Sequence, residues 1–195
     1  MRRPLSLILA SVLALAAALG GCAAAPLPLV PVEGRTLTPG RYLAGVWRDP
    51  EFQPERASFR LAAFPVEEAV DTAADRFLPL LEEELRRAFA ANGLRLTDTR
   101  EACAVSGAIH RVEVQGTRFR FLRGRISAEL EVSGAISQGE RVVFAFRDRF
   151  RLYSPISPGA PAPREEELLL TRISQELARR LLTELLLHGP PGESM

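Results

Sequence analysis

The histidines and cysteines are the residues of this chain best suited to catalysis. There are two of each: His110 and His188, Cys22 and Cys103. Nucleophilic hydrolysis needs a base beside a nucleophile and a third group that orients the base, and the sequence contains no Gly-x-Ser-x-Gly turn. His188 lies close to the C-terminus, and His110 lies within a predicted strand, where a hydrogen-bonded or surface histidine is the commoner finding. We therefore predict no catalytic residue and expect a protein that is not an enzyme; an enzymatic alternative would need an acid–base pair near His110 and Cys103.

The remaining composition excludes several further classes of chemistry. All 25 basic residues are arginine, which excludes a Schiff-base lysine and the phosphate-binding lysine of a Walker motif. Two cysteines and two histidines are too few for a zinc framework. The formal net charge of +1 argues against a nucleic-acid binder that relies on bulk charge. We therefore predict no metal, no cofactor and no nucleic-acid partner, and we expect Cys103 to be a small buried core residue.

The first 22 residues have the layout of a secretory signal, with Arg2 and Arg3 before an apolar stretch over 5–19. The ending Leu-Gly-Gly-Cys resembles a bacterial lipobox, in which the cysteine thiol receives a diacylglycerol and the chain is cut just before it. An ordinary signal peptide needs no cysteine at this place, and an uncleaved anchor helix needs about 20 apolar residues. We therefore predict a signal peptide over residues 1–21 and a lipidated, palmitate-bearing Cys22.

The mature chain is predicted to consist of a tether, one domain and a tail. Residues 22–40 are rich in small residues and proline, which favour an extended tether. Residues 41–188 are expected to form a single α+β periplasmic domain, and residues 189–195 a disordered tail. The residue after Cys22 is alanine rather than aspartate, which by resemblance to enterobacterial lipoproteins implies the periplasmic face of the outer membrane of a Gram-negative cell.

The hydrophobic pattern predicts four strands and two helices within this domain. Period-two alternation predicts strands over 58–66, about 105–114, 125–136 and 141–152, and apolar steps of three and four predict helices over 72–92 and 164–187. The simplest arrangement that buries every apolar stripe is a small, mostly antiparallel sheet with both helices packed on one face. The predicted fold class is therefore α+β, with about four strands in the order β-α-β-β-β-α.

Three positions depart from these patterns. The alternation in the predicted strand over 105–114 changes phase before Val112, which predicts a bulge. Pro79 either kinks the first helix or stands in the first turn of a regular helix that begins at Leu78. Asp148 falls on the apolar face of the last strand, which predicts a bulge or a frayed sheet end. That face is expected to consist of Val142, Phe144, Phe146, Phe150 and Leu152.

One region has a charge clearly above background. Residues 111–151 contain nine arginines against five acids, a local net charge of +4, whereas residues 67–87 contain seven acids against three arginines, a net charge of −4. Arginine side chains bind phosphate in a bidentate manner, and interleaved aromatic rings can lie on lipid. The alternative is a solvated sheet face. The candidate contact residues for anionic lipid or a protein partner are Arg118, Arg120, Arg123, Arg125, Arg147, Arg149 and Arg151.

The lipobox, the tether and the predicted element order together resemble small outer-membrane lipoproteins that act in envelope assembly. These include the lipopolysaccharide-assembly lipoprotein and the auxiliary lipoproteins of ABC-type lipid transporters. The segment Trp47-Arg48-Asp49-Pro50 also resembles a group of bacterial lipoproteins with a W-x-D-P segment. The resemblance implies a non-enzymatic, lipid-anchored protein that assists envelope assembly or lipid transport by binding an envelope protein. The alternative is direct binding of anionic lipid or lipopolysaccharide through the arginine-rich hairpin.

Overall fold

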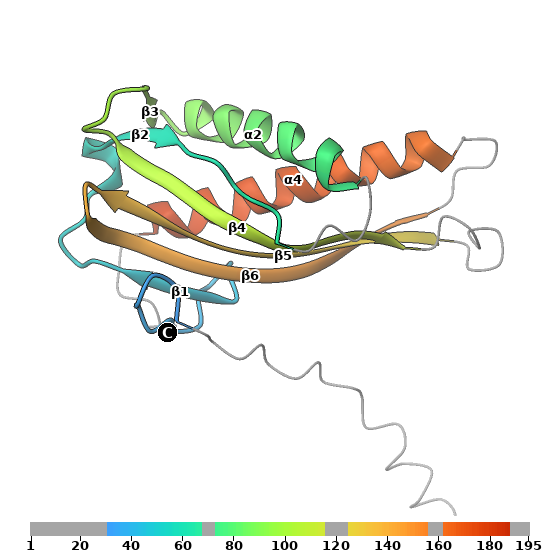
Figure 1. Cartoon of the computed structure of the whole chain (residues 1–195), viewed down its shortest axis with the longest axis horizontal. Coiled ribbons are helices and arrows are strands. Elements are labelled where there is room, and N and C mark those ends of the chain that lie inside the picture. The colour runs from blue at the N-terminus through green and yellow to red at the C-terminus, as the bar shows by residue number, and fades with distance from the viewer. Residues whose placement is uncertain (1–30, 68–72, 116–124, 156–161, 188–195) are drawn as a thin grey trace, which may run out of the picture.

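The computed structural model describes residues 31–67, 73–115, 125–155 and 162–187. These residues form one mixed six-stranded sheet with two long helices on one face (Figure 1). The predicted signal peptide with Cys22, the tail and the arginines at 118, 120 and 123 lie outside the described residues. No helix among the residues that the structure describes is long and apolar enough to cross a membrane.

The sheet has the strand order β1-β6-β5-β4-β2-β3. β2 is parallel to both β3 and β4, and the other three neighbouring pairs are antiparallel. A short 3-10 turn, η1, spans Pro54–Arg56. The strands are β1 (Gly45–Arg48), β2 (Ser58–Leu61), β3 (Arg95–Leu96), β4 (Cys103–Gln115), β5 (Arg125–Gln138) and β6 (Arg141–Pro155), and the helices are α2 (Ala73–Ala91) and α4 (Ala162–Leu186).

The α+β class and the two helices on one face agree with the prediction, but the strand count and the element order do not. β1 and β3 were missed, because strands of four and two residues are too short to show alternation. The first predicted strand ends at Leu61 rather than at residue 66. Only a single bridge, between Val66 and Ile109, continues the pairing beyond it. The observed order is β1-β2-α2-β3-β4-β5-β6-α4.

The helices cover the core face of the sheet with the predicted apolar stripes. Phe77, Leu81, Leu85 and Phe89 of α2 are each 2% exposed or less. On α4 the stripe Leu169, Ile173, Leu177, Leu181 and Leu185 is equally buried. Pro79 lies inside α2, which already begins at Ala73, so the regular helix does not start at Leu78. Pro79 is the seventh residue of α2 and so lies beyond the first four N–H groups, which have no partner within a helix; the proline therefore removes the hydrogen bond that an N–H at this position would donate to the carbonyl four residues earlier.

Two bulges set which side chains share a face of the sheet. The predicted bulge in β4 is present between Ile109 and Arg111. A second bulge follows the β5–β6 turn, where Ser137 pairs with Val142 but Ile136 pairs with Phe144. The prediction that Val142 lies on the core face of β6 is therefore wrong. The extra residue in the bulge places Val142 on the outer face, where it packs with Trp47, and buries Val143 in the core.

Asp148 is buried without the bulge or fraying that the sequence predicted. It pairs regularly with Val132 in the ladder and is only 1% exposed. The carboxylate accepts hydrogen bonds from the backbone N–H groups of Ala44 (3.2 Å) and Arg149 (3.0 Å), and it forms an ion pair with Arg180 of α4 at 3.2 Å. Burial raises the pKa of Asp148, and the arginine and the hydrogen bonds oppose that shift. A charged residue is therefore accommodated on the core face by partners from a helix and from the N-terminal segment.

Candidate functional site

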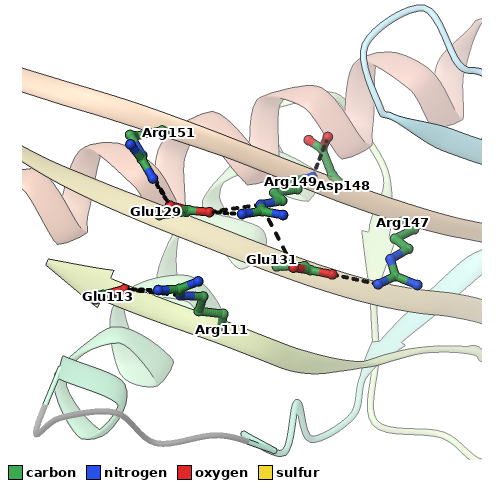
Figure 2. Close-up of polar contacts among 8 residues, drawn as sticks. All are labelled: Arg111, Glu113, Glu129, Glu131, Arg147, Asp148, Arg149 and Arg151. Atoms are coloured by element: carbon green, nitrogen blue, oxygen red, sulfur yellow. Dashed lines mark hydrogen bonds and ion pairs between the residues drawn. The ribbon is translucent and has the colours of Figure 1, made fainter. Parts of the chain in front are cut away.

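The described candidate arginines lie on the outer face of the sheet, away from the helices. Arg147, Arg149 and Arg151 follow one another at alternate positions of β6, and Glu129 and Glu131 do the same on β5 (Figure 2). In the ladder Arg151 lies opposite Glu129 and Arg149 lies opposite Glu131. Strand alternation therefore places basic side chains on β6 directly beside acidic side chains on β5.

Glu129 is the centre of this cluster. One carboxylate oxygen accepts hydrogen bonds from Nε (2.8 Å) and Nη2 (2.6 Å) of Arg149. The other accepts hydrogen bonds from Nε (3.1 Å) and Nη2 of Arg151. Its side chain is only 4% exposed. Burial raises the pKa of the Glu129 carboxyl, but the hydrogen bonds from Arg151 and Arg149 outweigh burial, so the pKa lies below its ordinary value. Glu129 is therefore a stable buried anion held between two guanidinium groups.

The neighbouring pairs neutralise most of the remaining charge. Arg147 donates to Glu131 at 2.5 Å, and Arg111 of β4 is paired with Glu113 on the same strand. The outer-face cluster, defined as Arg111, Glu113, Glu129, Glu131, Arg147, Arg149 and Arg151, carries four positive and three negative charges. The candidate Arg125 stacks over Tyr153, with 4.7 Å between the guanidinium carbon and the ring centroid. The described part of the arginine-rich hairpin is therefore close to neutral.

His110 makes two contacts that the sequence did not predict. Its Nδ1 lies 2.5 Å from a carboxylate oxygen of Glu67, and its Nε2 lies 2.8 Å from Oγ of Ser133. This connectivity matches that of a nucleophile, a base and an orienting acid. However, β5 is paired on both sides at Ser133, with Ala108 and with Arg147, so the backbone N–H of Ser133 itself is held in the ladder and does not face an oxyanion. The two contacts of His110 link the segment after β2 to β4, and β4 to β5.

The other candidate nucleophile, Cys103, packs in the core as predicted. It is 3% exposed and forms no disulfide, and it lies opposite Phe59 of β2. Burial raises the pKa of its thiol, which disfavours the reactive thiolate. No group of three or more metal-binding side chains occurs among the described residues.

The W-x-D-P segment has a structural role at each polar position. The Trp47 ring lies under Arg35, 4.4 Å from its guanidinium carbon. Arg48 donates to the last carbonyl groups of α4, including that of Glu184 at 2.7 Å. Asp49 accepts the backbone N–H of Glu51 at 3.0 Å and binds Arg141 of β6. These contacts attach the N-terminal lead-in, residues 31–57, to the domain.

Glu184 provides a second attachment of the lead-in. Its buried carboxylate accepts the backbone N–H groups of three successive residues, Arg41 (3.2 Å), Tyr42 (2.6 Å) and Leu43 (3.3 Å). Burial lowers the pKa of Arg48, and the nearby Glu184 carboxylate opposes that shift. Sequence analysis missed these contacts because the partners lie more than 140 residues apart. Part of the predicted tether also contacts the domain, since Leu37 is buried and Thr38 bridges to Val46.

An open groove of about 400 Å³ lies between the lead-in and the β5–β6 turn. Arg141 crosses it to reach Asp49 and Glu51, so its basic and acidic groups are paired with each other. The lining residues are Asp49, Glu51, Phe52, Gln53, Arg56, Ala57, Gln138, Arg141 and Val143. The groove is therefore lined by polar and apolar side chains in similar measure, and two carboxylates oppose the charge of Arg141.

Comparison with known proteins finds similarity in structure only. No protein-family model matches the sequence, and no curated protein is significantly similar to it. Among solved structures, rare lipoprotein B from Shewanella oneidensis has 15% identity and a TM-score of 0.41, with coverage of 65% of this chain and 92% of that one. A minor lipoprotein from Acinetobacter baumannii has 14% identity and a TM-score of 0.40, with coverage of 64% and 92%. Both are bacterial lipoproteins, and at this level of similarity neither establishes a function for this chain.

Proposed function

We propose that the protein is a lipid-anchored lipoprotein on the periplasmic face of the outer membrane, and that it assists envelope assembly or lipid transport by binding a protein partner. The signal and lipobox pattern ending at Cys22 supports the anchor. Several acyl chains on one cysteine hold a protein at a bilayer far more firmly than one chain does. The domain acts as a binding module rather than as an enzyme.

The attachment of the lead-in to α4 and β6 is the observation that carries this proposal. Arg48, Glu184 and Asp148 hold the segment that follows the tether against the domain. Only nine peptide steps then separate Cys22 from Pro31, where the described chain begins. A fully extended chain of that length reaches about 30 Å. The domain is therefore kept near the bilayer, at a distance that suits contact with a membrane-embedded partner.

The pairing within the outer-face cluster favours protein binding over direct lipid binding. A surface that binds anionic headgroups through bulk charge needs arginines without acidic partners, whereas Glu129 and Glu131 are in ion pairs with Arg147, Arg149 and Arg151. Lipid binding would then depend on the arginines at 118, 120 and 123. Binding to anionic vesicles that depends on salt and on those three arginines would favour the lipid alternative.

Two experiments test the proposal in sequence. Metabolic labelling with palmitate and fractionation of membranes should show label and membrane retention for the native chain and neither for a Cys22→Ala variant. Crosslinking in intact cells should then recover an envelope protein with the native chain and much less with the variant. A native chain that incorporates no palmitate would refute the anchor, and an anchored chain that recovers no envelope protein would refute the partner.

A further inference from the structure

Two arginines at the β2–β3 end of the sheet differ from those of the outer-face cluster, because no acidic side chain pairs with them. Arg60 of β2 and Arg95 of β3 form no side-chain hydrogen bond or ion pair with the described residues. Asp98 and Glu101 are the acids closest to Arg95 in the sequence, and neither forms an ion pair with these arginines. Asp98 lines a small pocket with Arg86 of α2, on the helix side of the sheet. The two guanidinium groups therefore carry positive charge that no described carboxylate opposes.

The register of β2 and β3 places both arginines on the outer face, next to Ser58. Phe59 is buried in the core and Leu96 packs against it, so strand alternation directs Ser58, Arg60 and Arg95 to the opposite face. Ser58 lies directly opposite Arg95 in the parallel pair. Neighbouring strands lie about 4.8 Å apart and alternate residues of a strand about 6.6 Å apart, so the Cα atoms of the two arginines are about 8 Å apart. Long side chains span such a diagonal, and both guanidinium groups can therefore reach one small ligand.

Arg60 also has a hydrogen-bond donor that the domain does not satisfy. Its Nε is buried and has no acceptor in the described part of the chain. The residue opposite Arg60 on β4 is Ala104, whose methyl group offers no acceptor. A buried N–H without an acceptor is costly, and folded proteins satisfy nearly all such groups. An acceptor from a bound anion would satisfy this donor.

The number of donors and charges specifies the kind of anion. Two guanidinium groups carry two positive charges and five N–H donors each, and the Ser58 hydroxyl adds one donor. A carboxylate has two oxygens and a single charge. A phosphomonoester has three terminal oxygens and a charge close to −2 at pH 7, and arginine binds phosphate in a bidentate manner. A phosphomonoester therefore matches this set of donors better than a carboxylate does.

We propose that Ser58, Arg60 and Arg95, the phosphate site, bind a phosphomonoester group. Each guanidinium donates to the phosphate oxygens, the Nε of Arg60 among the donors, and the Ser58 hydroxyl donates between them. A lipid headgroup and a soluble phosphate ester offer this same chemistry. The inference goes beyond the proposed function, because it assigns a ligand to the domain and does not depend on the protein partner. The phosphate site is also separate from the arginine-rich hairpin of the lipid alternative.

The test uses glycerol 3-phosphate as a soluble probe, titrated with the purified full chain in detergent and followed by phosphorus NMR. The native chain should bind the probe, and Arg60→Gln and Arg95→Gln should each raise the dissociation constant at least about tenfold. The matched control is Arg172→Gln, an exposed arginine of α4 that also has no partner within the described residues. It should change the dissociation constant by about twofold or less. Absence of binding by the native chain, or an equal loss in the control, would overturn the inference.

A lysine at position 60 separates a built site from a merely basic surface. Arg60→Lys keeps the charge but removes the Nε donor and the planar fork of the guanidinium. The dissociation constant should therefore rise about fivefold or more. Native affinity in Arg60→Lys would show that bulk charge alone attracts the probe and would refute the site. Arg95→Gln changes an exposed side chain, so its result stands even where a change at Arg60 destabilises β2.

A second experiment distinguishes the two sources of the phosphate. The full chain is reconstituted into phosphatidylcholine vesicles that contain either phosphatidic acid, a phosphomonoester, or phosphatidylglycerol, a phosphodiester, at equal surface charge, and the titration is repeated. A higher dissociation constant of glycerol 3-phosphate in the phosphatidic acid vesicles alone would show that a lipid headgroup fills the phosphate site. Equal constants in the two kinds of vesicle would assign the site to soluble phosphate esters.

Discussion

Replacing Glu184 by glutamine should detach the lead-in while leaving the rest of the domain folded. The carboxylate accepts three backbone N–H groups at 3.2, 2.6 and 3.3 Å, from Arg41, Tyr42 and Leu43. An amide has one oxygen in place of two and carries no charge, so at least one N–H loses its acceptor and the others lose charge assistance. Arg48 also loses the nearby negative charge that opposes the effect of its burial.

The magnitude follows from these contacts. A hydrogen bond to a charged group contributes about 1.5–3 kcal/mol, and a buried donor left unsatisfied costs a similar amount. Loss of one bond and weakening of two should lower the free energy of docking the lead-in by about 2–3 kcal/mol. The control is Glu83→Gln on α2, whose side chain is 64% exposed and pairs with Arg87. That exposed pair should contribute less than about 0.5 kcal/mol.

The single tryptophan allows the two events to be measured separately. Trp47 lies on β1, within the lead-in, so its fluorescence reports docking, whereas far-ultraviolet circular dichroism reports the whole sheet and both helices. In urea, the fluorescence transition of Glu184→Gln should precede the circular dichroism transition, and the two should coincide in the native chain and in Glu83→Gln. Coincident transitions in Glu184→Gln, displaced by no more than those of the control, would show that the carboxylate does not hold the lead-in.

Three further results are expected. Hydrogen bonding from Arg179 lowers the pKa of Glu176 from 4.5 to about 2, so the native chain should lose stability as pH falls from about 4.5 to about 2. In acid titrations followed by circular dichroism, Glu176→Gln should lose about 1 kcal/mol less stability than the native chain over that interval. The Cys103 thiol should react with an aromatic disulfide only as fast as the protein unfolds; rapid labelling under native conditions would contradict its burial. Gly134→Ala should lower the free energy of unfolding by about 2–3 kcal/mol, because the added methyl carbon would lie 2.6 Å from the carbonyl oxygen of Ser106. A urea midpoint equal to that of the native chain would contradict this crowding.

The parts of the fold that sequence predicted are those with a long local period. The stripes of α2 and α4 repeat every three to four residues over 19 and 25 residues, and both helices were located within two residues of their observed ends. The bulge before Val112 was also visible, because it changes the phase of alternation within one strand. β3 has no such period, since it contains two residues that pair with Ser58 and Phe59 from a distant part of the chain.

The ion pairs of the outer-face cluster depended on register, which alternation alone does not determine. If the pairing of Gln138 with Arg141 had continued without a bulge, Glu129 would lie opposite Phe150 and Glu131 opposite Asp148. The extra residue at Val143 shifts the register by one and brings Glu129 opposite Arg151. Sequence therefore predicted an arginine row on one face, and only the structure showed that its charge is mostly neutralised.

Docking of the lead-in also sets the local concentration at which the domain meets a partner in the same membrane. With residues 31–57 held on the domain, nine peptide steps connect it to Cys22; with the lead-in detached, 35 steps would do so. The domain and its partner both diffuse laterally, so the tether confines the domain only along the bilayer normal. The reach of a flexible chain grows as the square root of its length. Detachment would therefore dilute the domain about twofold with respect to a partner in the same membrane, and would lower the occupancy of a weak partner-binding surface accordingly.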